Sequence, residues 1–187
     1  MASPDNKNNW DCALAEAAFM TGLERNADVV NMTSYAPLFA HAEGWQWTPD
    51  LIWFNNLESY ATPNYYVQQL YGQNPGTVLV KITDNGQPVT GKNNMYATAV
   101  IDSNTKEVII KIVNTGDKAQ KTDITLKGKK VASQGTMTTL GNENLTSENN
   151  FGKEAITPKT GKFATKGSSI SAEIPAYSFV VLKVKLQ

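Results

Sequence analysis

The sequence has few of the residues from which many functional sites are built. Its 187 residues include one cysteine, Cys12, and one histidine, His41. A single cysteine excludes an internal disulfide framework, and no CxxC or Cys/His cluster indicates structural zinc. No apolar run approaches 18 residues, so we expect no membrane-spanning helix. The start, Met1 to Lys7, lacks the basic and apolar regions of a secretory signal as it stands.

Common catalytic and nucleotide-binding motifs are also missing. The sequence contains no GxGxxG, GxxxxGK[ST], GxSxG or HExxH. Cys12 lies in an alanine-rich segment, which predicts a buried structural thiol. His41 has no evident partner in the sequence, so we expect a structural or exposed side chain. We predict no cofactor and no metal site.

The net charge of zero conceals two unlike halves. Residues 1–71 carry two basic and eight acidic side chains, a net charge of −6, whereas residues 72–187 carry fifteen lysines and nine acids, a net charge of +6. All four tryptophans precede residue 72. We therefore predict two domains, residues 1–72 and 73–187, joined at the loop-forming segment 72–76. The second half has no arginine, so we expect its lysines on a solvated face and no nucleic-acid partner.

The first half has the pattern of a helix, a strand and a second helix. Asn8 or Asn9 is a suitable N-cap for a helix over residues 10–25, and its apolar stripe comprises Trp10, Leu14, Ala17, Ala18 and Thr21. Glu16 and Glu24 are expected on its solvated faces. A short helix is predicted over 28–32, a strand buried on both faces over 51–54, and a helix over 63–71 with Thr62 as its N-cap.

The second half has the pattern of antiparallel β-structure. Strands are predicted over residues 95–101, 107–113, 121–126, 168–174 and 179–186. Short strands separated by turns rich in glycine, asparagine and lysine are typical of a β-sandwich. The fold class is therefore α+β.

Two tryptophans, Trp45 and Trp47, lie in a loop with glycine, threonine and proline. They either pack on neighbouring helices or stack on sugar rings, whose C–H faces suit aromatic surfaces. Glu43 and Glu58 are also in loops, where either could approach a site.

Residues 13–26, 34–39 and 49–54 form long, specific strings in this sequence. They resemble the C-terminal part of the α-L-arabinofuranosidases of glycoside hydrolase family 51. The resemblance is strong over residues 9–71 and weaker through the β segment. It rests on residues 13–26, 28–30, 34–39, 47, 49–54 and 62–68, and further on 107–114 and 174–179.

The resemblance implies a (β/α)8 barrel followed by a jelly-roll-like antiparallel β-sandwich. Residues 10–40 would be the helix region after barrel strand seven, 51–54 strand eight and 63–71 the closing helix. The sandwich would begin at about residue 76. The first half would thus be a helix-strand-helix remnant, and its helices would pack on the sandwich, pair between copies as a homo-oligomer or be poorly ordered.

The resemblance also implies the activity of the whole protein. Family members are retaining enzymes with two glutamates, at the ends of strands four and seven, held about 5–5.5 Å apart. Neither glutamate has a counterpart here, so no catalytic residue is carried over and this chain alone is predicted to be inactive. The whole protein would release terminal arabinofuranose from arabinan or arabinoxylan. The alternative is a non-catalytic carbohydrate-binding or structural sandwich module.

Candidate substrate-binding residues follow from the rule that barrels place function at the C-terminal ends of their strands. They are Trp45, Trp47, Asn55, Asn56, Glu58, Tyr60 and Thr62. The expected partner is an arabinose-containing polysaccharide, reached through the whole enzyme, with no nucleic acid and no membrane. Enzymes that degrade plant polysaccharides are often exported, which makes the periplasm or the exterior the candidate location.

Overall fold

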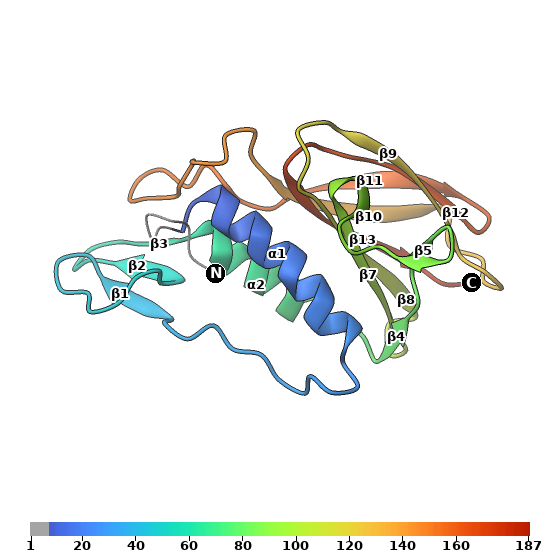
Figure 1. The fold of residues 1–187 in the computed structure, drawn as a ribbon, viewed down its shortest axis with the longest axis horizontal. Helices are drawn as coiled ribbons and strands as arrows, with labels where there is room; N and C mark the ends of the chain where they lie inside the picture. Colours follow the sequence, from blue (N-terminus) through green and yellow to red (C-terminus); the bar gives the residue numbers. More distant parts are fainter. Residues whose placement is uncertain (1–7) are drawn as a thin grey trace.

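The computed structural model describes residues 8–187, which form two helices lying on a large antiparallel sheet, with a small sheet beside them (Figure 1). Helices α1 (Trp10–Arg25) and α2 (Pro63–Gly72) pack on each other. The small sheet has the order β1-β2-β3 and consists of β1 (Phe39–His41), β2 (Ile52–Phe54) and β3 (Ser59–Ala61). The first half of the chain therefore has three strands where one was predicted.

Both predicted helices are confirmed, together with their caps. The Asn9 side chain accepts a hydrogen bond from the Cys12 amide at 3.0 Å, and Asn26 is the C-cap. The Thr62 hydroxyl accepts from the Tyr65 amide at 3.3 Å. The predicted helix over 28–32 is wrong. Residues 26–29 form a turn, after which the chain is irregular, and the adjacent β-branched valines of this segment are poor helix formers.

The large sheet has the strand order β4-β7-β8-β13-β10-β11-β12-β9. Every pairing within it is antiparallel. Its strands are β4 (Val78–Val80), β7 (Met95–Asp102), β8 (Glu107–Asn114), β9 (Gln120–Thr125), β10 (Gln134–Gly141), β11 (Lys159–Lys166), β12 (Ser169–Ile174) and β13 (Ser178–Lys185). A hairpin of β5 (Thr83–Asp84) and β6 (Gln87–Pro88) and a 3-10 turn, η1 (Lys92–Asn94), precede β7. The predicted α+β class with a sandwich is confirmed.

The sheet curves so that side chains from its two ends meet in one core. Ile170 and Ile174 of β12 pack there with Ile110 of β8 and with Val180 and Leu182 of β13. All five are at most 2% exposed. This inner core is aliphatic in its buried members, as expected for a small β-sandwich.

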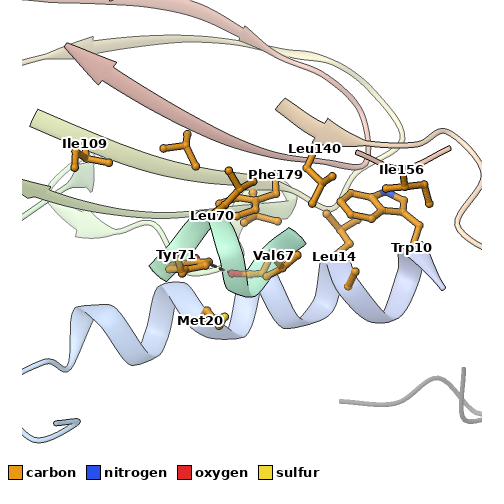
Figure 2. Packing of buried hydrophobic residues seen from close by; sticks show 14 of the residues in the cluster. Trp10, Leu14, Met20, Val67, Leu70, Tyr71, Ile109, Leu140, Ile156 and Phe179 are labelled. Atoms are coloured by element: carbon orange, nitrogen blue, oxygen red, sulfur yellow. Dashed lines mark hydrogen bonds between the residues drawn. The ribbon is translucent and has the colours of Figure 1, made fainter. Parts of the chain in front are cut away.

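A second core lies on the other side of the same sheet, against the helices (Figure 2). Trp10, Val67 and Phe179 are fully buried in it, and the Tyr71 ring stacks on Phe179 at 5.1 Å. The Trp10 indole also donates a hydrogen bond to the Tyr177 carbonyl at 2.8 Å. Of the three expectations for the helices, packing on the sandwich is therefore the one observed. The division into domains 1–72 and 73–187 stays a prediction, since the two parts share this core.

A buried lysine corrects the expectation that all lysines face solvent. Lys111 is fully buried on the helix side of β8, where Ile109 and Val113 also point. Its ammonium forms an ion pair with Glu24 of α1, donates to the Asn74 carbonyl at 2.8 Å, and lies 5.2 Å from the centre of the Tyr71 ring. Burial lowers the pKa of Lys111, while Glu24 opposes that shift. Glu24 and the buried Glu16 were both expected in solvent, and both expectations are wrong.

Candidate functional site

The two helices begin at the same end of the molecule, and buried polar side chains gather there. Asn8 donates from its side-chain amide to Asn64 of α2 and to the Tyr35 hydroxyl, both at 3.1 Å. Asn64 and Gln68 in turn each donate an amide hydrogen to Glu16 of α1. We call Asn8, Tyr35, Asn64, Gln68 and Glu16 the polar seam. It fixes the two helix starts relative to each other.

Burial controls the protonation of this region. It raises the pKa of Glu16, and the hydrogen bonds from Asn64 and Gln68 oppose the shift. It also raises the pKa of Tyr35, so this phenol is neutral at physiological pH. Asp50, just before β2, is 2% exposed, its Oδ2 has no hydrogen-bond partner among residues 8–187, and burial raises its pKa.

Polar side chains also lie at one end of the small sheet. Strands β1 and β2 are parallel, so their carboxyl ends lie at the same end of the small sheet. His41 is the last residue of β1, and Asn55 directly follows β2. His41 accepts from the Glu43 amide at its Nδ1, 3.2 Å away, so its Nε2 carries the proton and donates to Asn56 Oδ1 at 3.4 Å. His41 therefore has a partner that its sequence context did not reveal.

The predicted substrate-binding residues divide into exposed and structural positions. Trp45 and Trp47 are 51% and 70% exposed, and Asn56 and Glu58 are also exposed. Tyr60 is half-buried.

Two of these positions have evident local roles. The Asn55 side chain accepts from the amides of Leu57 and Glu58 at 2.8 and 2.7 Å, which shapes the turn from β2 to β3. Thr62 is buried, caps α2 and donates to the Leu51 carbonyl at 2.9 Å. A substrate contact by any of the seven stays a prediction.

The expectation that strand 51–54 is buried on both faces is wrong. Ile52, Trp53 and Phe54 are half-buried, because β2 lies in a three-stranded sheet with solvent access. One face carries His41 against Phe54, with ring centres 5.2 Å apart. The other carries Trp45 against Trp53, at 6.1 Å. Trp45 thus packs on a neighbouring ring and still exposes half of its surface.

Two aromatic residues at the small sheet, Trp53 and Phe151, were not among the predicted substrate-binding residues. Trp53 lies opposite Tyr60 in the β2–β3 register. Phe151, from the connection between β10 and β11, contacts Tyr60 with ring centres 4.9 Å apart. About ninety residues separate Phe151 from Tyr60, so no local pattern could have brought them together.

The described part of the chain, residues 8–187, has no cluster of three or more His, Cys, Asp or Glu side chains arranged to hold a metal ion. None of its helices is both long and apolar enough to cross a membrane.

The two helices run in the same direction and lie on one side of the antiparallel sandwich. The family model described as the α-L-arabinofuranosidase C-terminal domain matches residues 2–178. The chain therefore belongs to this family and corresponds to the C-terminal region of the family 51 enzymes.

Individual relatives agree with this assignment. The chain is 33% identical to α-L-arabinofuranosidase 1 of Arabidopsis thaliana over 174 residues, which are 89% of this chain and 25% of the relative. Over 89 residues, 45% of this chain and 11% of the relative, it is 54% identical to an extracellular exo-α-L-arabinofuranosidase of Streptomyces chartreusis. The chain thus spans about a quarter or less of the length of these relatives.

Solved structures of the family superpose on the chain. An arabinose-bound family 51 α-L-arabinofuranosidase matches with a TM-score of 0.88 and 32% identity, covering 97% of this chain and 28% of that one. The α-L-arabinofuranosidase of Thermotoga maritima, in complex with arabinose, has a TM-score of 0.76 at 18% identity, and covers 94% of this chain and 38% of that one. The second similarity concerns the fold alone.

Proposed function

We propose that this chain is the C-terminal part of a retaining α-L-arabinofuranosidase that releases terminal arabinofuranose from arabinan or arabinoxylan. In this proposal the remainder of the protein supplies the catalytic barrel and both catalytic glutamates. The first half of the chain closes that barrel, and the sandwich supports it from outside.

The observation that carries the proposal is an apolar surface on the side of the helix layer away from the sandwich. Phe19 of α1 is 57% exposed, Val29 71%, Met32 87% and Phe39 60%. Large apolar side chains that are exposed in number on one side of a molecule indicate a surface that binds another protein part. The rest of a longer enzyme, of which the chain spans about a quarter, is the natural cover.

The direction of the helices also supports the proposal. In (β/α)8 barrels the outer helices run antiparallel to the strands, so helix starts lie at the face that carries the active site. Here α1 and α2 begin together at the polar seam, and His41 and Asn55 lie at the carboxyl ends of the parallel strands β1 and β2. The predicted substrate-binding residues from Trp45 to Tyr60 would then belong to the active-site face.

The chain alone is proposed to be inactive because a retaining mechanism needs two carboxyl groups across the scissile bond. Removing either member of such a pair abolishes most of the rate, since the two act as a unit. The resemblance gives neither catalytic glutamate a counterpart in this chain, and Glu16 and Glu24 are held in structural contacts.

The test is hydrolysis of a nitrophenyl α-L-arabinofuranoside by this chain and by the longer protein that contains it. We expect turnover only by the longer protein. Turnover by the chain alone that is lost on substituting one of its own carboxylates would contradict the proposal. Saturable binding of arabino-oligosaccharides by the isolated chain, centred on the sandwich and without activity in the longer protein, would favour the binding-module alternative.

A further inference from the structure

One loop of the sandwich extends to the end of the molecule where the helices begin. The connection between β10 and β11, residues 142–158, is drawn in orange in Figure 1 and lies over the start of α1. The carbonyls of Ser147 and Leu145 accept hydrogen bonds from the amides of Trp10 and Asp11, both at 2.9 Å. Amides in the first turn of a helix have no acceptor within it, so loop 142–158 satisfies two of them.

Polar contacts fix the same loop to β3 and α2. Asn149, 3% exposed, bonds through its side chain to both backbone groups of Ile156, at 2.9 Å each, and to the Ala61 carbonyl at 3.0 Å. Glu154 accepts from the Tyr66 hydroxyl at 2.7 Å and from the Ala61 amide at 3.3 Å. Ile156 is fully buried. Loop 142–158 is therefore a fixed part of this end of the molecule.

The loop adds one ring to a series of aromatic side chains on the small sheet. The Phe151 ring meets Tyr60 edge to face at 4.9 Å and 84°. Tyr60 lies directly opposite Trp53, so both side chains point to the same face of the sheet. Trp53 in turn meets Trp45 at 6.1 Å and 74°. We call Trp45, Trp53, Tyr60 and Phe151 the aromatic row.

The chemistry of the aromatic row suits a neutral sugar chain. Its rings carry no charge, and burial raises the pKa of Tyr60, which keeps that phenol protonated. Trp45 is half exposed and the other three rings are partly exposed. Within each contacting pair the two rings are nearly perpendicular, so the pair exposes the face of one ring and the edge of the other. The apolar C–H faces of a sugar ring pack on such aromatic surfaces.

We propose that the aromatic row binds the polysaccharide main chain beyond the terminal arabinofuranose, and that Phe151 is a specificity-determining residue supplied by the sandwich. A row of four rings that begins in the first half of the chain and ends in loop 142–158 is longer than one sugar needs. It therefore distinguishes a polymer from a small glycoside. The inference rests on the proposed function and names the part of the substrate that this end of the molecule contacts.

The experiment compares two substrates in the longer protein that contains this chain. Phe151→Ala is expected to raise KM for arabinan about five- to tenfold, the loss of one aromatic contact of about 1–1.5 kcal/mol. On a nitrophenyl α-L-arabinofuranoside, kcat/KM should stay within about twofold of the unmodified protein. Trp45→Ala at the other end of the row should raise KM for arabinan by a similar factor.

Matched variants separate ring stacking from loop structure. Phe151→Tyr keeps the ring and should retain the KM for arabinan. Lys153→Ala alters an exposed side chain of the same loop and should leave the kinetic constants for both substrates unchanged. Phe151→Leu keeps an apolar side chain without a ring, and serves if the alanine variant unfolds. Equal losses on both substrates, or no loss on either, would overturn the inference.

The outcome for the row is independent of the outcome for the proposed function. If the unmodified longer protein hydrolyses neither substrate, the proposed function fails. Affinity electrophoresis in gels containing arabinan then tests separately whether the aromatic row binds this polysaccharide. Retardation that is lost in Phe151→Ala and kept in Phe151→Tyr supports it, and equal migration of all variants contradicts it.

Discussion

The two sides of the helix layer differ in whether a partner covers them. Towards the sandwich, Trp10, Leu14 and Val67 are at most 3% exposed and pack on strands of the large sheet. On the opposite side, Phe19 and Met32 are more than half exposed. Both sides carry apolar residues, so composition alone does not separate them. The inner side is thus a shared core, and under the proposed function the outer side is the surface that the rest of a longer enzyme covers.

The largest expected effect comes from truncating one aromatic residue on each side of the same helix. Trp10→Ala removes a fully buried indole and its hydrogen bond, and should lower the free energy of unfolding by about 3–5 kcal/mol. Phe19→Ala, on the outer side of α1, should change it by less than about 0.5 kcal/mol in the isolated chain. Urea unfolding of both variants measures the contrast. Similar losses of unfolding free energy in both variants would show that the outer side is already buried in the isolated chain.

A smaller loss is expected from the buried ion pair that holds α1 on the sheet. Lys111→Met leaves Glu24 without its cation and should cost about 3 kcal/mol, at the lower end for a broken buried pair because Glu24 keeps some solvent contact. Adding Glu24→Gln should recover part of this loss. A double-mutant cycle by urea unfolding measures the coupling between the two positions, and strictly additive effects would contradict a direct interaction.

The smallest effect is a pH dependence that originates in the polar seam. Burial raises the pKa of Glu16 above its ordinary 4.5, so just above pH 4.5 the folded protein keeps a proton that the unfolded chain has released. The resulting stabilisation is fully present below pH 4.5 and is lost as the pH rises through the raised pKa. Glu16→Gln cannot titrate, so its stability relative to the unmodified chain should increase over that interval. A difference that is constant across a pH series of urea unfolding curves would contradict this.

Local sequence patterns were sufficient for both helices and for several strands. Caps at Asn9 and Thr62 identified the starts of both helices, because capping depends on neighbours a few residues apart. Strands β7 and β8 were equally evident. Strands β10 and β11 were missed, since their threonine, glycine and lysine residues gain strand structure from pairing in a central sheet rather than from their own preference.

Long-range contacts were not accessible to the same reasoning. Lys111 alternates with Ile109 and Val113 along β8, which places it under the helices, and only the fold supplies Glu24 as its partner. The contact of Phe151 with Tyr60 likewise depends on loop 142–158 crossing from the sandwich to the small sheet. The candidate site could thus be predicted in part, from Trp45 to Thr62, whereas the contribution of the sandwich could not.

The central claim is that the outer side of the helix layer is an interface with the rest of the enzyme, and amide hydrogen exchange tests it most directly. Exchange would be compared in the isolated chain and in the longer protein. We predict strong slowing in residues 29–39 when the rest is present, and little change in the sandwich-facing half of α1 and in α2, where amides are already protected by the shared core. Equal exchange of residues 29–39 in both proteins would contradict the claim.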